Sequence, residues 1–189
     1  MPGSAFAGLL APRPGPDPIW VEARTGDGLA SVIARKGRAD ALRGWVSSLH
    51  GWDIPDGASR LAAGPVSFVG TAPDTWLAMQ DGGGFAWAER LAREFAGFAS
   101  VSDQCGAYGL VRLGGSAAAD VLAKGVFLDL HPAVFSEGAA AATVLAHVNV
   151  VLWRRADCFE LAVPRSYAAD FAHWLTASAV GFGLDVRLP

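Results

Sequence analysis

The same order of predicted strands and helices occurs twice along the chain, and this duplication restricts the fold more than any other feature. Apolar runs and helical periodicity predict strand, helix, strand, strand, helix and strand in each half. In the first half they predict strands 29–34, 66–70, 75–79 and 99–105 and helices 39–50 and 85–98. In the second half they predict strands 108–113, 144–154, 159–163 and 184–188 and helices 116–124 and 166–179. We therefore predict an α+β fold of duplicated ferredoxin-like β-α-β-β-α-β halves, with antiparallel sheets and helices on one side of each.

Local residue patterns support these elements. Apolar side chains of the helix predicted at 85–98 recur at helical spacing, at Trp87, Leu91, Phe95 and Phe98. Ser116 is a suitable N-cap for the helix that it begins. Asp74 and Asp157 each lie at a turn before a strand with a large aromatic residue, so the two predicted hairpins resemble each other.

The first 18 residues differ in composition from the rest. Residues 12–18 contain four prolines, which exclude a helix or a central strand. We predict that residues 1–18 form an extended proline-rich arm, either free or lying across a partner. Residues 19–189 are predicted to be a single domain, with halves at about 19–105 and 106–189.

The composition indicates a protein that contacts other proteins. Charged residues make up 17% of the chain, against about 25% in typical domains, and there are seven tryptophans. Interface centres are depleted in charge and enriched in large aromatics, although a surface covered by alanine is the alternative. The candidate interface anchors are Trp45, Trp52, Trp76 and Trp87. The periodicity of Trp76 and Trp87 also fits core positions.

Other partners are disfavoured. The 15 basic and 18 acidic residues are too evenly balanced to indicate nucleic acid or an anionic membrane. The longest apolar region, 139–153, is interrupted by polar residues and is too short to span a bilayer. No secretory signal is recognisable, so Cys105 and Cys158 are expected to be reduced thiols in the cytoplasm.

No pattern typical of catalysis, cofactor binding or metal binding occurs in the sequence. The four histidines are scattered, and the glycines around 106–115 lack the spacing of a dinucleotide fingerprint. Gly114-Gly115-Ser116 joins a strand to a helix and is predicted to be a tight turn. Asp103 and Asp129 are the only pair of carboxylates that we consider for acid–base chemistry. We therefore predict no catalytic, cofactor-binding or metal-binding residues.

Several motifs of residues 99–180 occur together in one order. They are Val101-Ser102-Asp103-Gln104, Leu113-Gly114-Gly115-Ser116, Asp129-Leu130-His131-Pro132 with Phe135 and Gly138, Phe159-Glu160-Leu161, and Val163-Pro164-Arg165-Ser166. This series resembles the gamma subunit family of heterotetrameric sarcosine oxidase. The motif residues are Gly114, Asp129, His131, Pro132, Pro164, Arg165 and Ser166. A purely structural interpretation of the second motif is a turn in which Asp129 caps backbone amides and Pro132 fixes the exit.

The resemblance implies a fold similar to the folate-binding lobe of the glycine-cleavage T-protein. It also implies a non-catalytic cytoplasmic subunit that docks on the large flavoprotein subunit during oxidative demethylation of sarcosine. The partners would be the alpha, beta and delta subunits, and FAD, FMN, NAD and tetrahydrofolate would be held by those subunits. One alternative is a free-standing folate-binding or one-carbon transfer protein in which Asp103 or Asp129 pairs with the pterin ring. The other is a gamma-like subunit of a related complex that oxidises N-methylglutamate or dimethylglycine.

Overall fold

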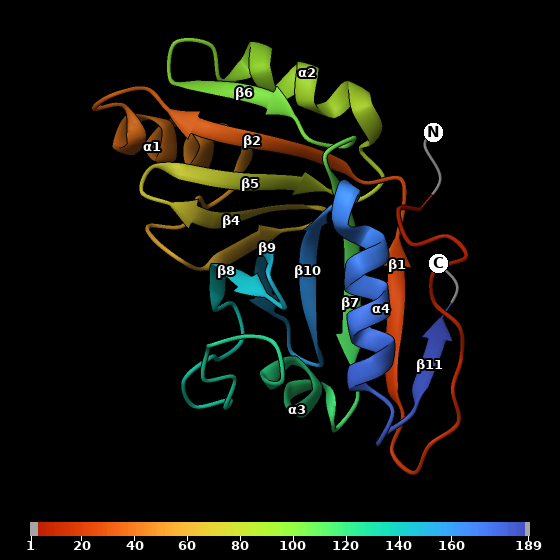
Figure 1. The fold of residues 1–189 in the computed structure, drawn as a ribbon. Coiled ribbons are helices and arrows are strands. Elements are labelled where there is room, and N and C mark those ends of the chain that lie inside the picture. Colours follow the sequence, from red (N-terminus) through yellow and green to blue (C-terminus); the bar gives the residue numbers. More distant parts are fainter. Residues whose placement is uncertain (1–3, 188–189) are drawn as a thin grey trace. The chain divides into compact units, whose positions relative to one another are not determined.

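The computed structural model describes residues 4–187, which form two compact units (Figure 1). Unit 1 comprises Gly26–Gly106, and unit 2 comprises residues 4–25 and 107–187. Residues 1–3 of the predicted arm and residue 188, the predicted end of the last strand, lie outside the described part of the chain.

Unit 1 is a five-stranded antiparallel sheet with two helices packed on one face. Its elements are β2 (Gly28–Ala34), α1 (Ala39–His50), β3 (Arg60–Ala63), β4 (Val66–Ala72), β5 (Thr75–Gln80), α2 (Gly84–Glu94) and β6 (Ala99–Asp103). The strand order is β3-β4-β5-β2-β6. Four of these strands have the ferredoxin-like order, and β3 is an edge strand that the sequence analysis missed.

The core of unit 1 lies between the sheet and both helices. Apolar side chains on alternate positions of the strands meet the apolar stripes of α1 and α2, and the large buried ones include Trp76, Trp87, Phe68, Phe95, Leu42 and Leu91. The predicted helix 85–98 is too long, because α2 stops at Glu94 and Gly97 takes a left-handed conformation with φ 87°. Phe95 is nevertheless fully buried, so the helical spacing identified a true core position.

Unit 2 repeats this plan with one strand inserted. Its elements are β1 (Ile19–Arg24), β7 (Tyr108–Gly114), α3 (Ala118–Ala123), β8 (Ala140–Leu145), β9 (Val148–Arg154), β10 (Cys158–Pro164), the short 3-10 helix η1 (Arg165–Tyr167), α4 (Ala168–Ser178) and β11 (Leu184–Arg187). The strand order is β11-β1-β7-β10-β9-β8. Strand β1 lies between β7 and β11, whereas in unit 1 the equivalent strands β2 and β6 are direct neighbours. The pairing of β1 with β11 is parallel, and the others are antiparallel.

The predicted boundary of the first half was therefore wrong. Residues 19–24 form a strand of unit 2, so the described chain runs from unit 2 into unit 1 and then returns. The prediction of an arm that is free or on a partner is also wrong for the described residues. Phe6 is buried against Phe171, and Arg13 exchanges backbone hydrogen bonds of 2.7 and 2.8 Å with Leu184. The prolines leave Arg13 an N–H to donate, so an extended segment still pairs with the edge strand.

Two further predictions were wrong in unit 2. The strand predicted at 144–154 is a hairpin of β8 and β9, turned by Ala146 and His147, which have φ angles of 47° and 72°. A two-residue turn with positive φ at both positions usually contains Gly or Asn, and neither residue is present at this turn to indicate it. Ser116 is not an N-cap, because α3 begins at Ala118 and the Ser116 hydroxyl instead donates to the carboxylate of Asp17, with O–O distances of 2.7 and 2.6 Å.

The core of unit 2 lies between its sheet and the helices α3 and α4. Large buried side chains from these elements include Ile19, Leu113, Leu122, Leu152, Phe171 and Leu175. Within residues 4–187 we find no helix with the length and apolarity needed to cross a bilayer.

Candidate functional site

A buried carboxylate, Glu160, is the most unusual polar feature of unit 2. It lies in the middle of β10, and only 2% of its side chain is exposed. Oε1 accepts hydrogen bonds from Arg112 Nε at 2.9 Å and Arg24 Nη1 at 3.1 Å. Oε2 accepts from Trp153 Nε1 at 3.0 Å and Arg155 Nη1 at 3.2 Å. We call these five residues the Glu160 cluster.

The strand register assembles the cluster from four separate segments. Glu160 is directly opposite Arg112 on β7 and Trp153 on β9, so these side chains share one face of the sheet. Glu22 on β1 is in turn opposite Arg112, and its carboxylate lies 3.8 Å from Arg112 Nη1. Arg24, two residues after Glu22 on the same strand, projects from the same face. The core with α3 and α4 lies on the other face, which carries Leu113, Phe159, Leu161 and Leu152.

The electrostatics of the cluster fix its protonation state. Burial alone would raise the pKa of Glu160, but Arg112, Arg24 and Arg155 outweigh it and hold the pKa below its ordinary value. At neutral pH the group is a carboxylate whose two oxygens each accept two hydrogen bonds. Because these four donors all belong to unit 2, we interpret the cluster as structural, joining β1, β7, β9 and β10.

Sequence reasoning missed this cluster, although a signal was present. Glu160 is the only charged residue in the otherwise apolar run 158–163. A charge inside a central strand requires a buried partner. The partners could not be named without the register, because Arg24 is 136 residues away in sequence.

Neither cysteine lies in an environment that activates a thiol. Burial, a hydrogen bond with Asp103 and the charge of that residue raise the pKa of Cys105 to about 11. Burial, together with the charges of Asp157 and Glu160, raises the pKa of Cys158 to about 12. Both thiols are free, and neither has the lowered pKa of a catalytic nucleophile.

We expect both thiols to react slowly with iodoacetamide at pH 7.5. A pKa raised by two units or more reduces the thiolate fraction roughly 100-fold, and the thiolate is the reacting species. Mass spectrometry of the native protein over time measures the rate, with the urea-unfolded chain as the control that alkylates freely. Rapid alkylation of either thiol in the folded protein would contradict this expectation.

The motif Asp129 to Pro132 forms a turn in the loop between α3 and β8. Asp129 is exposed, and its Oδ1 accepts from the backbone N–H of His131 at 2.9 Å. His131 Nδ1 accepts from the backbone N–H of Ala133 at 3.2 Å. The interpretation of Asp129 as a cap for backbone amides is confirmed. Asp103 makes the same type of hydrogen bond in unit 1, where its Oδ1 accepts from the backbone N–H of Cys105 at 3.0 Å.

The other motif residues lie where the backbone turns or where a strand ends. Gly114 ends β7, where a Cβ would collide with the indole of Trp20. Pro164 ends β10, and the 3-10 turn that follows begins at Arg165, whose N–H donates to Ala107 O at 2.8 Å. Ser166 lies in that turn and is exposed.

The four candidate tryptophans fall into two classes. Trp76 and Trp87 are 1% and 3% exposed, so their assignment as interface anchors was wrong and their periodicity correctly indicated core positions. Trp45 and Trp52 are half-buried. Trp45 stacks on Phe98 with centroids 5.5 Å apart, and Trp52 stacks on His50 at 4.2 Å. These two retain exposed surface for a partner.

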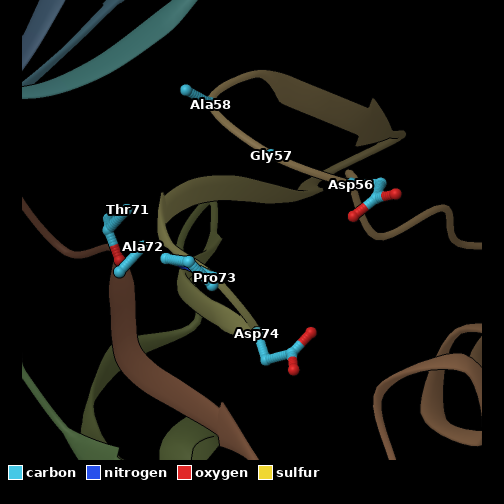
Figure 2. Close-up of a pocket in the computed structure, with 7 residues that line it drawn as sticks. All are labelled: Asp56, Gly57, Ala58, Thr71, Ala72, Pro73 and Asp74. Atoms are coloured by element: carbon cyan, nitrogen blue, oxygen red, sulfur yellow. The ribbon is translucent and has the colours of Figure 1, made fainter.

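A pocket of about 300 Å³ lies in unit 1 between the loop at 56–58 and the β4–β5 turn at 71–74. Figure 2 shows Asp56 and Asp74 as its two acidic lining residues. Arg43 Nη2 lies 3.1 Å from Asp56 Oδ1 and 3.9 Å from Asp74 Oδ1, and its Nη1 lies 2.9 Å from Asp40 Oδ1, so one guanidinium is shared by three carboxylates. Within residues 4–187 no group of three or more His, Cys, Asp or Glu side chains could hold a metal ion.

The doubled α+β architecture places the chain in a class of proteins with solved members. The aminomethyltransferase T of the glycine cleavage system from Bartonella henselae matches 97% of this chain and 49% of its own, with a TM-score of 0.63 and 15% identity. A chain of the heterotetrameric sarcosine oxidase from Corynebacterium sp. U-96, in complex with pyrrole 2-carboxylate, matches 96% of both chains with a TM-score of 0.83 and 22% identity. The predicted α+β fold, similar to that of the T-protein, is thus confirmed.

The sequence identifies the family. Residues 35–180 match the model of the sarcosine oxidase gamma subunit family, SoxG, and the chain belongs to this family. The sarcosine oxidase subunit gamma of Arthrobacter sp. is 32% identical over 128 residues, which cover 67% of this chain and 59% of the relative. That of Corynebacterium sp. strain P-1 is 35% identical over 104 residues, which cover 54% and 51%. The chain therefore matches between half and three fifths of the length of these relatives.

Proposed function

We propose that the chain is the non-catalytic gamma subunit of a heterotetrameric sarcosine oxidase and docks on its large flavoprotein subunit. The observation that carries the proposal is the family match across residues 35–180. The hydrogen bonds that the candidate polar groups make within the chain also support it. Glu160 accepts four hydrogen bonds within unit 2, and Asp103 and Asp129 bind backbone amides next to them. These contacts stabilise the chain itself.

The proposal assigns the chemistry to other subunits. In it, the alpha, beta and delta subunits hold FAD, FMN, NAD and tetrahydrofolate and carry out the oxidative demethylation of sarcosine. The gamma chain contributes docking surface, for which half-buried Trp45 and Trp52 are candidates in unit 1. The proposal places the assembly in the cytoplasm, where the free thiols of Cys105 and Cys158 stay reduced.

Co-expression with the other three subunits tests the proposal. We expect the chain to co-elute with them in a stable complex that oxidises sarcosine. Expression of the three subunits without this chain should give a complex that is less stable to heat. Recovery of this chain alone, beside an intact active complex of the other three, would overturn the proposal.

Folate binding is the second candidate, because the fold is similar to that of an aminomethyltransferase. Asp103 and Asp129 are exposed carboxylates that could pair with a pterin ring. Calorimetry of the isolated chain with tetrahydrofolate distinguishes the two functions. Heat of binding that is lost in Asp103→Asn or Asp129→Asn would favour the folate candidate, and no heat would remove it.

A further inference from the structure

The loop between α3 and β8 displays the most exposed large hydrophobic side chain among residues 4–187. Phe127 is 97% exposed, whereas the large apolar residue with the next highest exposed fraction, Val134, is 64% exposed. An isolated exposed apolar residue is ordinary on a protein surface. Phe127 is not isolated in this way, because a second exposed apolar residue lies near it and its backbone is held in place. These two features are those of a docking contact.

The exposed apolar side chain that lies near Phe127 is Val144, the fifth residue of β8. Val126 and Leu145 form an isolated antiparallel bridge, and both are buried in the core of unit 2. Phe127 follows Val126, and Val144 precedes Leu145. Because side chains alternate along extended backbone, Phe127 and Val144 point away from that core. Val144 is 43% exposed, so two exposed apolar residues adjoin the bridge, one from each paired segment, and we call them the apolar patch.

The backbone that carries Phe127 is held on both sides. Before it, Gly125 O accepts from the N–H of Ala146 at 3.0 Å, next to the Val126–Leu145 bridge. After it, Leu130 is 4% exposed and its carbonyl accepts from Arg154 Nη1 at 3.1 Å.

The motif residues hold the rest of the loop. Asp129 and His131 make their hydrogen bonds within it, and Phe135 is buried against Phe159. The motif therefore gives the loop a defined shape, which keeps the entropic cost of docking low.

The charges near the patch indicate the chemistry of its partner. Asp129 and Glu137 are exposed acidic residues of this loop. The lysine at its start, Lys124, donates to Ser178 O at 2.6 Å and lies over the ring of Phe182, so its charge is directed to the end of α4. Arg154, a second cation near the loop, donates to Leu130 O and lies over the ring of Phe159 at 5.0 Å. The loop thus presents an aromatic side chain together with two exposed carboxylates, which are complementary to an apolar pocket with a basic rim.

We propose that Phe127 and Val144 form a docking patch that inserts into an apolar, basic-rimmed pocket of the large subunit of the oxidase. This inference rests on the proposed function and specifies where the contact is made. The Asp129–His131 turn acts through the loop as a positioning element, and it does not itself need to touch the partner.

The test measures binding of the purified chain to a complex of the other three subunits by surface plasmon resonance. We expect Phe127→Ser to bind about 30-fold more weakly or worse, as for an aromatic hot spot. Tyr167→Ser is the matched control, because Tyr167 is another aromatic residue of unit 2, 49% exposed in η1 at the start of α4, and we expect its affinity to be unchanged. Glu137→Lys should slow association at low salt, because it removes attraction to the basic rim.

Phe127→Arg is a second variant that places a cation against the proposed rim, and we expect it to bind more weakly than Phe127→Ser. Circular dichroism melting of each free variant confirms that folding is intact. If the wild-type chain binds and both Phe127 variants bind as tightly as the wild type, the docking patch is overturned while the subunit role stands. If the wild-type chain itself does not bind, the proposed function fails, and the docking patch fails with it.

Discussion

Replacing Glu160 by alanine is expected to lower the free energy of unfolding of unit 2 by about 3–5 kcal/mol, the usual cost of removing one partner from a buried ion pair. The substitution leaves the guanidinium groups of Arg24, Arg112 and Arg155 without their shared carboxylate. It also leaves the N–H of buried Trp153, which is fully shielded from solvent, without its acceptor. Glu160→Gln should cost less, because the amide oxygen still accepts while the amide nitrogen faces a donor.

Urea unfolding followed by circular dichroism measures this effect. Glu137→Ala is the matched control, since Glu137 is exposed, and its change should stay within about 0.5 kcal/mol. A loss below about 1 kcal/mol in Glu160→Ala would show that the cluster contributes little.

The effect of Glu160 should depend on pH. Its pKa is lowered in the folded protein, so the carboxylate stabilises the fold above the ordinary glutamate pKa of about 4.3. That contribution is lost as the pH falls through the lowered value. The stability difference between wild type and Glu160→Ala should therefore shrink between pH 5 and pH 3. A constant difference over this range would contradict the lowered pKa.

Replacing Trp76 by alanine is expected to lower the free energy of unfolding of unit 1 by about 3–5 kcal/mol, because a buried indole leaves a large cavity. Trp76 is 1% exposed in the core formed by β2, β4, β5, α1 and α2. Its Nε1 donates to Pro55 O at 2.8 Å, and Arg43 lies over its ring at 5.4 Å. The substitution thus also releases the loop before β3.

Two comparisons make the Trp76 result specific. Trp76→Phe should cost less, because it keeps most of the packing and loses mainly the hydrogen bond, about 1 kcal/mol. Leu49→Ala on α1 is the control, as Leu49 is 59% exposed, and it should leave stability nearly unchanged. If Trp76→Ala unfolds like wild type but weakens binding to the other subunits, Trp76 is an anchor after all.

The family motifs acquire a physical meaning from the fold. Asp129 fixes a turn, Gly114 leaves room for the indole of Trp20, and Pro164 ends a central strand before a 3-10 turn. None of these roles requires a ligand. They shape the backbone that places the exposed Phe127 loop and the buried Glu160 cluster.

Residue patterns alone predicted the doubled element order, most strands and helices, and the core positions of Trp76, Trp87 and Phe95. These features depend on the periodicity of side chains along a single segment, and a local pattern of this type can be recognised in the sequence. The family motifs could be recognised for the same reason, since each is a short run of residues.

The pairing of the strands, in contrast, could not be predicted from residue patterns. The placement of β1 between β7 and β11, the docking of Arg13 on β11 and the four-segment Glu160 cluster all join residues far apart in sequence. Strand pairing is chosen by the burial and hydrogen bonding of the whole sheet, and periodicity within one strand carries no information about its neighbour. The turn at Ala146 and His147 belongs to the same group, because the pairing of β8 with β9 stabilises a backbone conformation that its own residues do not favour.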